Sequence, residues 1–277
     1  MITDGAITER HRRPALPEGG PESIGEDDAL ARLDRAFEES VRLHQRSDVP
    51  YGLFLSGGVD SGAVLAMMAR LNDRPVRAFT AVFDAPGAAD ERAAAEAAAC
   101  AAGAIHATVN VTEAEVWRHL PRIVAALDDP AADYAVIPSW FLARRAREEV
   151  KVVLSGEGGD EIFGGYGRYR SAMRPWWLGG KRPRATGTFD HVGDVLREAP
   201  RLWRDGLGAA EAEAATPGRT RLMAAQAADI AAWLPNDLLL KLDRCLMAHA
   251  VEGRTPFLDP GVAAAGFRLP DGLKVRR

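Results

Sequence analysis

Two glycine-rich segments, residues 56–61 (SGGVDS) and 155–166 (SGEGGDEIFGGY), carry the side chains best suited to chemistry in this chain. Each follows a short apolar run, residues 53–55 or 150–154, of the kind typical of a strand buried in a parallel sheet. Ligands of open α/β sheets bind where such strands end, because the carboxyl ends of parallel strands meet at one edge. The two segments are therefore the candidate binding site.

The first segment has the composition of a phosphate-binding turn. Two glycines let the backbone approach a ligand without a Cβ in the way, and free amides at the start of the following helix attract phosphate oxygens. Two serines add hydroxyl donors, and an aspartate fits an anion site when a divalent cation bridges it to the phosphates. The members of this set are Ser56, Gly57, Gly58, Asp60 and Ser61. A tight turn without a ligand would account equally well for the glycines alone.

The second segment places hydroxyl and acidic side chains among five glycines. If both segments leave the same edge of the sheet, they face each other across one nucleotide, and Asp160 shares a magnesium ion with Asp60. A structural turn with solvated carboxylates is the alternative, and the pairing with residues 56–61 makes it the weaker interpretation.

The elements that must position these segments alternate along the chain. Helices are predicted at 27–45, 59–71, 88–102, from 113 onward and at 139–149, and strands at 53–55, 77–83, 105–111 and 150–154. Thr112 and Glu115 form a capping box, and Pro121 is expected to kink or split the helix that they open. The alternation predicts an α/β fold with a doubly wound parallel sheet.

Three regions are expected along the chain. Residues 1–25 read as a polar tail or linker, residues 26–169 as the α/β domain that carries both glycine-rich segments and binds the nucleotide, and residues 170–277 as a mainly helical remainder. The remainder contains predicted helices at 219–232 and 234–252 and a rigid turn at 253–260. Lys241, Asp243 and Arg244 lie among leucines and need partners, because an unpaired buried charge is costly. They either pair with each other or mark an end of the helix that faces the nucleotide.

Composition narrows the class of protein. The net charge of −4 leaves no basic footprint for nucleic acid. There is no signal peptide and no apolar run of about 18 residues, so no membrane association and a cytoplasmic location are expected. Cys100 and Cys245 are far apart and are expected to be buried free thiols rather than a disulfide or metal site.

Four blocks of the sequence together resemble the synthetase domain of glutamine-hydrolysing asparagine synthetases, members of the ATP pyrophosphatase (PP-loop) group. They are residues 54–62, 128–146 with 152–169, 234–244 and 247–260. The block SGEGGDEIFGGY is specific to this family, and β-lactam-forming and peptide-cyclising relatives share it. The resemblance implies the adenine nucleotide α-hydrolase fold and a ligase that uses ATP and Mg²⁺. Such a ligase adenylates the side-chain carboxylate of aspartate, releases pyrophosphate and transfers ammonia to give asparagine.

Carried over by position, the resemblance also implies roles for single residues. Phe54 and Ala81 would line the adenosine pocket, while Ser155 and Gly156 would contact the nucleotide or the bound substrate. Ser56, Gly57, Gly58 and Ser61 would hold pyrophosphate, and Asp60 and Asp160 would ligate magnesium. Glu157 would serve formation or breakdown of the acyl-adenylate, and Arg244 and Arg254 match basic positions near the phosphates.

Two features depart from the family pattern. The N-terminal glutaminase domain begins with a cysteine nucleophile and is expected to be absent here, because Ile2 follows Met1 and no cysteine precedes Cys100. A lysine that follows the segment 269–274 (LPDGLK) in the family has no counterpart before Arg277. The asparagine-forming ligase remains the leading interpretation, and two alternatives to it stay open. One is a related enzyme acting on another carboxylate, in a surface polymer, lactam or peptide ring. The other is a truncated nucleotide-binding chain that needs a partner such as a glutaminase subunit.

Overall fold

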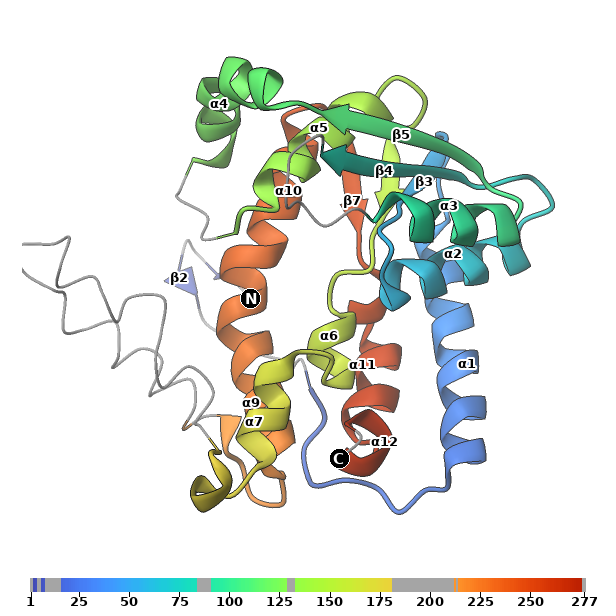
Figure 1. Cartoon of the computed structure of the whole chain (residues 1–277). Helices are drawn as coiled ribbons and strands as arrows, with labels where there is room; N and C mark the ends of the chain where they lie inside the picture. Colours follow the sequence, from blue (N-terminus) through green and yellow to red (C-terminus); the bar gives the residue numbers. More distant parts are fainter. Residues whose placement is uncertain are drawn as a thin grey trace, which may run out of the picture.

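A five-stranded parallel sheet with the strand order β5-β4-β3-β6-β7 forms the centre of the molecule (Figure 1). The computed structural model describes residues 2–3, 6–7, 16–83, 91–128, 133–180, 212 and 214–275. The strands of the sheet are β3 (Tyr51–Phe54), β4 (Arg77–Phe83), β5 (Ile105–Val111), β6 (Val152–Leu154) and β7 (Glu252–Arg254). The short strands β1 (Ile2–Thr3) and β2 (Ala6–Ile7) pair with each other in antiparallel orientation.

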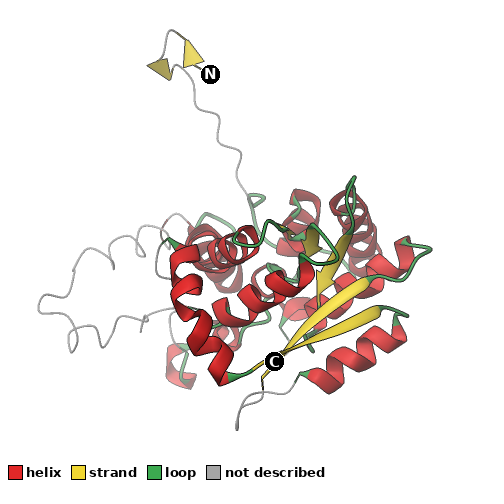
Figure 2. Cartoon of the chain, turned by 90° about the horizontal axis from the view of Figure 1, so that it is seen from above, coloured by secondary structure: helices red, strands yellow, loops and turns green. Residues whose placement is uncertain are grey.

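Helices cover both faces of the sheet (Figure 2), which confirms the predicted doubly wound α/β class. One face carries α1 (Glu26–His44), α2 (Val59–Leu71) and α3 (Arg92–Ala101), and the other carries α4 (Glu113–Leu127), α5 (Val136–Ala146) and α10 (Leu239–Met247). The remaining elements are α6 (Gly159–Phe163), α7 (Gly167–Met173), η1 (Trp176–Leu178), α9 (Arg221–Ala228), the π-helical η3 (Asp229–Leu238), η4 (Pro256–Leu258), α11 (Pro260–Phe267) and α12 (Asp271–Lys274).

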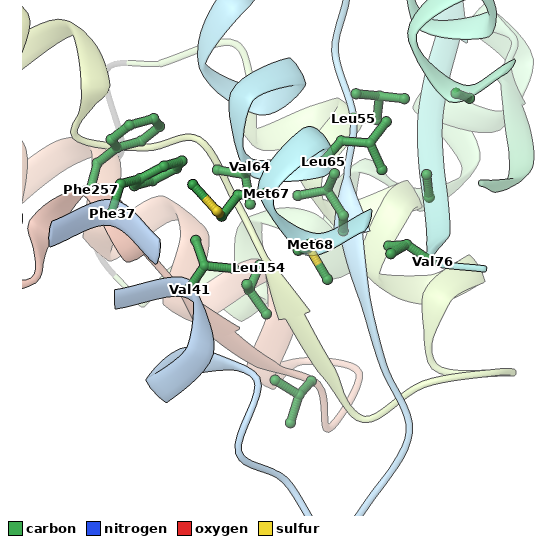
Figure 3. Close-up of a cluster of buried hydrophobic side chains, with 14 of the residues drawn as sticks. Phe37, Val41, Leu55, Val64, Leu65, Met67, Met68, Val76, Leu154 and Phe257 are labelled. Atoms are coloured by element: carbon green, nitrogen blue, oxygen red, sulfur yellow. The ribbon is translucent and has the colours of Figure 1, made fainter. Parts of the chain in front are cut away.

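The strands are apolar on both sides because each side meets a layer of helices. Val152 and Leu154 belong to a core cluster with Val41 of α1 (Figure 3), whereas Val153 between them belongs to a second cluster with Phe141 of α5. Alternate residues of one strand thus enter opposite cores, as expected for a sheet buried on both faces.

The strand order places a switch point between β3 and β6. From β3 the chain proceeds to β4 and β5 on one side and then returns to β6 on the other side. Leu53 of β3 is paired with Leu154 of β6, so the two strands end next to each other. The segments that follow them, residues 56–61 and 155–166, therefore leave the sheet at neighbouring positions.

Local sequence patterns predicted several elements to the residue and failed at others. The bounds of α2, β4 and β5 are those expected, and the Thr112–Glu115 capping box opens α4. Pro121 does not split α4, because Ile123 and Leu127 beyond it are buried and this packing holds the last turns in helical form. Residues 84–90, part of which were assigned to the next helix, lie outside the described residues.

The C-terminal half differs from the prediction in two ways. Instead of two helices separated near residue 233, α9, η3 and α10 form one uninterrupted helical run whose π-helical part contains Pro235. Residues 252–254, of which the first was assigned to the end of a helix and the other two to a turn, form β7, which pairs with β6 and completes the sheet. The sequence Glu-Gly-Arg has no apolar alternation that would have predicted a strand.

Part of the region assigned to a polar tail is packed against the domain. Leu16 is buried in a cluster with Met223 and Phe267, and Glu22 forms ion pairs with Arg32 and Arg268. Residues 16–25 therefore connect the start of α1 to the C-terminal helices.

Both cysteines are free thiols, and only one is buried. Cys245 lies in the core beside α5, whereas Cys100 is exposed, which corrects the expectation that both are buried. In the described part of the chain, no helix has the length and apolar character needed to cross a membrane.

Candidate active site

A cavity of about 700 Å³ lies at the carboxyl edge of the sheet, where β3 and β6 end side by side. Its walls come from the ends of β3 and β4, from both glycine-rich segments, and from α5 and α10. The predicted site residues that line it are Phe54, Ser56, Gly58, Asp60, Ser61, Ala81, Ser155, Gly156, Glu157 and Asp160. Residues far apart in the sequence thus meet in one place, at the switch point of the sheet.

The first glycine-rich segment forms a compact turn that leaves amides free. The Ser56 amide donates to Ser61 Oγ at 3.0 Å, and the hydroxyl oxygens of these two serines lie 2.9 Å apart. Gly58 is the N-cap of α2 and provides no side-chain cap, and among the described residues no acceptor is recorded for the amides of Val59 and Asp60. Unpaired amides at the positive end of a helix are the donors that bind phosphate.

The second segment touches the first because two of its residues lack a Cβ. A Cβ on Gly156 would lie 2.8 Å from the Ser61 nitrogen, and a Cβ on Gly159 would lie 2.5–2.8 Å from the carboxyl atoms of Asp60. Both distances are shorter than van der Waals contact, so only glycine permits this approach. The two segments are in direct contact across the floor of the cavity.

Asp60 sits in an environment that disfavours its charged form. Burial and, to a smaller extent, the nearby charges of Asp160 and Glu157 together raise the pKa of Asp60 to about 6. Burial also raises the pKa of Asp160, while Arg168 has the opposite, weaker effect. Burial and like charge are the two conditions that a bound cation would relieve.

These carboxylates fit a magnesium ion that is completed by ligands from a substrate. Among the described residues, no group of three or more His, Cys, Asp or Glu side chains is arranged as a metal site. Mg²⁺ is commonly bound through one or two carboxylates, with phosphate oxygens and water as the other ligands. Asp60 and Asp160 match that pattern, since Asp60 belongs to the turn of residues 56–61 and Asp160 lines the same cavity.

A buried lysine, Lys241 of α10, holds the acidic side chain of Glu157 in the cavity. Its Nζ lies 2.8 Å from Asp133 Oδ2 and 3.2 Å from Glu157 Oε1. Burial by itself would lower the pKa of Lys241, but the charge of Glu157 and the hydrogen bond to Asp133 outweigh it and the pKa is raised. The sequence indicated that a lysine among leucines needs a partner, but the spacing of residues did not identify Asp133 and Glu157.

A further carboxylate in the wall, Glu161, was not assigned a role from sequence. Burial raises its pKa to about 7, and the Tyr166 hydroxyl donates to its Oε1 at 2.8 Å. The Arg168 guanidinium lies 3.8 Å from the centre of the Tyr166 ring and pairs with Asp229 Oδ2 at 2.8 Å. The contacts from Glu161 through Tyr166 and Arg168 to Asp229 connect the wall of the cavity to η3.

Three of the predicted site residues are absent from the cavity wall. The Gly57 amide donates to Glu91 Oε2 at 3.3 Å, and Arg244 pairs with Asp128 at 3.3 Å on a partly exposed surface. Arg254 Nη1 donates to the carbonyls of His44 and Arg46 at the end of α1, 2.8 Å from each oxygen. The structure therefore places the Arg254 side chain against the end of α1 and outside the cavity lining.

Comparison with known proteins identifies relatives of the whole described fold. The sequence model of the family described as asparagine synthase matches residues 32–277. A Mycobacterium tuberculosis protein titled "Putative asparagine synthetase (glutamine-hydrolyzing)" is 37% identical over 302 residues, which cover 95% of this chain and 46% of the relative. Asparagine synthetase (glutamine-hydrolyzing) 1 of Bacillus subtilis is 32% identical over 295 residues, which cover 92% of this chain and 46% of that protein.

A third relative matches over a shorter part of the chain. Asparagine synthetase B (glutamine-hydrolyzing) of Escherichia coli is 33% identical over 148 residues, 48% of this chain and 26% of that protein. The chain thus spans about half the length, or less, of the curated relatives it matches.

Proposed function

The chain belongs to the asparagine synthase family, and on that premise we propose that it is an ATP-dependent ligase domain that forms amides through an acyl-adenylate. In the proposed reaction, the side-chain carboxylate of aspartate attacks the α-phosphate of ATP, giving β-aspartyl-AMP and pyrophosphate. Ammonia then replaces AMP and yields asparagine. The reaction consumes ATP and a free amino acid, and we place it in the cytoplasm.

The observation that carries this proposal is the direct contact between the two glycine-rich segments. Gly156 and Gly159 lie against Ser61 and Asp60, so the carboxylates of Asp60 and Asp160 lie in one cavity with the phosphate-binding turn. A plain structural turn does not need two aspartates held in a setting that raises the pKa of both. Two carboxylates close together in a buried place are expected where Mg²⁺ and a polyphosphate bind.

The phosphate side of the cavity stabilises the leaving group. Amides at the start of α2 and the hydroxyls of Ser56 and Ser61 are positioned to donate to pyrophosphate oxygens. Asp60 and Asp160 would hold Mg²⁺, which neutralises charge on the departing pyrophosphate when bound. Phe54 and Ala81 at the ends of β3 and β4 offer an apolar wall to adenine.

The reaction of the acyl group with ammonia also needs a proton acceptor. Ammonia that attacks the acyl carbon becomes positively charged and must lose a proton, so a carboxylate is needed there as a base. Glu157 lies in the cavity wall, and the ammonium group of Lys241 lies 3.2 Å from its Oε1 and holds the carboxyl group in place. We assign Glu157 as the proton acceptor and Lys241 as the residue that positions it.

The proposal also names a source of ammonia and an acyl substrate. The words "glutamine-hydrolyzing" in the names of the relatives describe those longer proteins. For this chain, ammonia is proposed to come from a glutaminase domain or subunit. A carboxylate other than aspartate is the second candidate substrate, and the assay below compares the two.

The test is the release of AMP from ATP labelled at the α-phosphate, in the presence of Mg²⁺, ammonium chloride and aspartate. AMP is expected to form only when aspartate is added, and Asp160→Asn is expected to reduce the rate at least about 100-fold. Asp73→Asn, at an exposed position outside the cavity, is the matched control and should leave the rate unchanged.

Two results would reject parts of this proposal. If AMP forms with another carboxylate but not with aspartate, aspartate is not the substrate, and the proposal of an amide-forming ligase still stands. Binding of ATP without AMP formation for any carboxylate tested, also in a chain extended at both ends to the length of the relatives, would reject the ligase.

A further inference from the structure

We infer that a second cavity, on the side of the sheet that carries α4 and α5, is a binding site for a small oxyanion, a phosphate or carboxylate group. The cavity has a volume of about 520 Å³ and is lined by residues of α4, of α5 and of the turn that follows α10. None of these residues lines the active-site cavity, so the two sites are separate.

The lining is strongly positive. Arg122 of α4, together with Arg144 and Arg147 at the end of α5, contributes three guanidinium groups, and no acidic side chain is present in the wall. Among the described residues, none of these three arginines forms an ion pair with a carboxylate, although pairs of this kind hold Arg145 on the same helix. Guanidinium groups without a carboxylate partner around a concave surface match the geometry of phosphate and carboxylate ligands.

Buried histidine nitrogens inside the cavity also have no partner. His249 is 8% exposed, and no hydrogen bond satisfies its Nε2. Its ring is stacked edge-on against Trp140, with the ring centres 4.5 Å apart, so it cannot turn freely toward another acceptor or donor. A buried polar atom that lacks a partner is rare in a folded protein and indicates a missing ligand or water.

The tautomer of His119 points to the sign of that ligand. Arg144 Nη1 lies 3.0 Å from His119 Nε2, and because arginine only donates hydrogen bonds, Nε2 is the acceptor. The proton of the neutral ring is therefore on Nδ1, which is buried and has no partner. Burial and the charges of Arg144 and Arg122 lower the pKa of His119, in keeping with a neutral ring. The ring that carries this N–H donor lines the cavity together with the three arginines, so the polar groups of the lining are donors suited to an anion.

The end of α5 does not by itself explain this cluster. Basic residues are favoured in the last turn of a helix, which accounts for the presence of Arg144 and Arg147. It does not account for Arg122, which comes from another helix, or for a buried histidine at the end of α10. A small molecule suits the volume of the cavity, which lies in the usual range for ligand pockets of about 300–1,000 Å³.

The site can be tested by titrating inorganic phosphate into the full chain labelled with ¹⁵N-histidine. Imidazole resonances of His119 and His249 are expected to shift together and to saturate at millimolar phosphate or below. His106, whose Nε2 lies 2.7 Å from the Thr80 hydroxyl at the active-site cavity, reports phosphate that binds there instead. Succinate in place of phosphate distinguishes a site for phosphates from a site for carboxylates.

The double variant Arg144→Gln/Arg147→Gln is expected to weaken phosphate binding roughly tenfold or more, since it removes two charged donors. Both side chains are exposed, so the fold should be retained. Arg74→Gln, at an exposed position far from the lining residues in sequence, is the matched control and should bind as the unmodified chain does.

Absence of a saturable shift, or the same affinity in the double variant, would overturn the proposal. A chain extended to the length of the relatives offers a further contradiction. Suppose that its added residues shift the His119 and His249 resonances, while phosphate does not shift them in the shorter chain. The cavity is then an interface between protein domains and not a site for a small anion.

Discussion

Single residues around the active-site cavity are held in states that cost stability. The pKa of Asp60 is raised to about 6 and that of Glu161 to about 7, in both cases mainly because the carboxyl group is buried. A folded protein that keeps its carboxyl groups in such places loses stability when they ionise. The cost is understandable if Asp60 is placed for a cation that is supplied with the substrate.

Asp60→Asn is therefore expected to stabilise the chain in buffer without Mg²⁺. The folded-state pKa of about 6 exceeds the unfolded value of 3.8, so the folded state binds more protons between these values and stability falls as the pH rises through them. Asparagine avoids this loss. Allowing for partial exposure, the gain at pH 8 should be about 1–2 kcal/mol, and it should shrink as the pH falls below about 6.

Thermal unfolding of Asp60→Asn and of the original chain between pH 4.5 and pH 8 measures this effect. Asp73→Asn, at an exposed position, is the control and should show no such dependence on pH. A variant that is less stable than the original chain at pH 8 would show that the charge of Asp60 is compensated within the protein.

Lys241→Met should destabilise the chain by about 3 kcal/mol, because it leaves the carboxylates of Glu157 and Asp133 without their cation. Adding Glu157→Gln to this variant should restore part of the loss. The free energy of unfolding in urea is the measurement, with exposed Lys151→Met as the control. Additive effects of the two substitutions would mean that Lys241 and Glu157 are not coupled.

At the scale of the elements, the sequence predicted what local patterns encode. Residues 59–71, 77–83 and 105–111 have a clear periodicity, and their structure follows it. The strand β7 was missed because it forms through pairing with β6, which is far away in the sequence, and its own residues have no strand pattern. Whether Pro121 splits its helix could not be decided from sequence for the same reason, since the packing of the flanking turns decides it.

The parts of the candidate site that follow from the order of the strands were predicted, and the parts that depend on the direction of single side chains were not. Parallel strands that end at one edge bring Asp60 and Asp160 together, and this follows from the order of the elements. The direction of a side chain at the end of a strand does not follow from that order, and Arg254 consequently lies against α1. The partner of Lys241 does not follow from the order of the elements either, because Asp133 lies on a separate segment before α5.

The contact between the glycine-rich segments should fail when a Cβ is introduced. Gly156→Ala is expected to reduce the rate of AMP formation about 100-fold, because the added methyl group would lie 2.8 Å from the Ser61 nitrogen and force the segments apart. Gly62→Ala in α2 is the matched control, since a Cβ there meets no atom within 4 Å. Full activity of Gly156→Ala would show that the close approach is unimportant.

On the scale of the whole molecule, the cores do not separate at residue 169, where the sequence suggested a boundary. Phe257 belongs to the same core cluster as Phe37, with the two rings stacked 4.6 Å apart (Figure 3). On the other face, Leu246 of α10 packs in the cluster of Phe141. The C-terminal half thus supplies part of both cores as well as the fifth strand.

A polypeptide of residues 26–169 is accordingly expected not to fold alone. Without α10, α11 and β7, both core clusters and one edge of the sheet would be exposed to water. Near-ultraviolet circular dichroism and urea unfolding should show no cooperative transition, in contrast to the 277-residue chain. A cooperative transition of the shorter polypeptide would establish it as an independent domain.

Calorimetric titration of ATP, with and without Mg²⁺, tests most directly whether Asp60 and Asp160 act on one nucleotide. The chain is expected to bind ATP more tightly when Mg²⁺ is present, and Asp60→Asn and Asp160→Asn should each remove that gain. The double variant should bind no more weakly than either single variant, because both carboxylates serve the same ion. If the two losses add, or if either variant keeps the full effect of Mg²⁺, the two carboxylates do not share an ion and the proposed site is wrong.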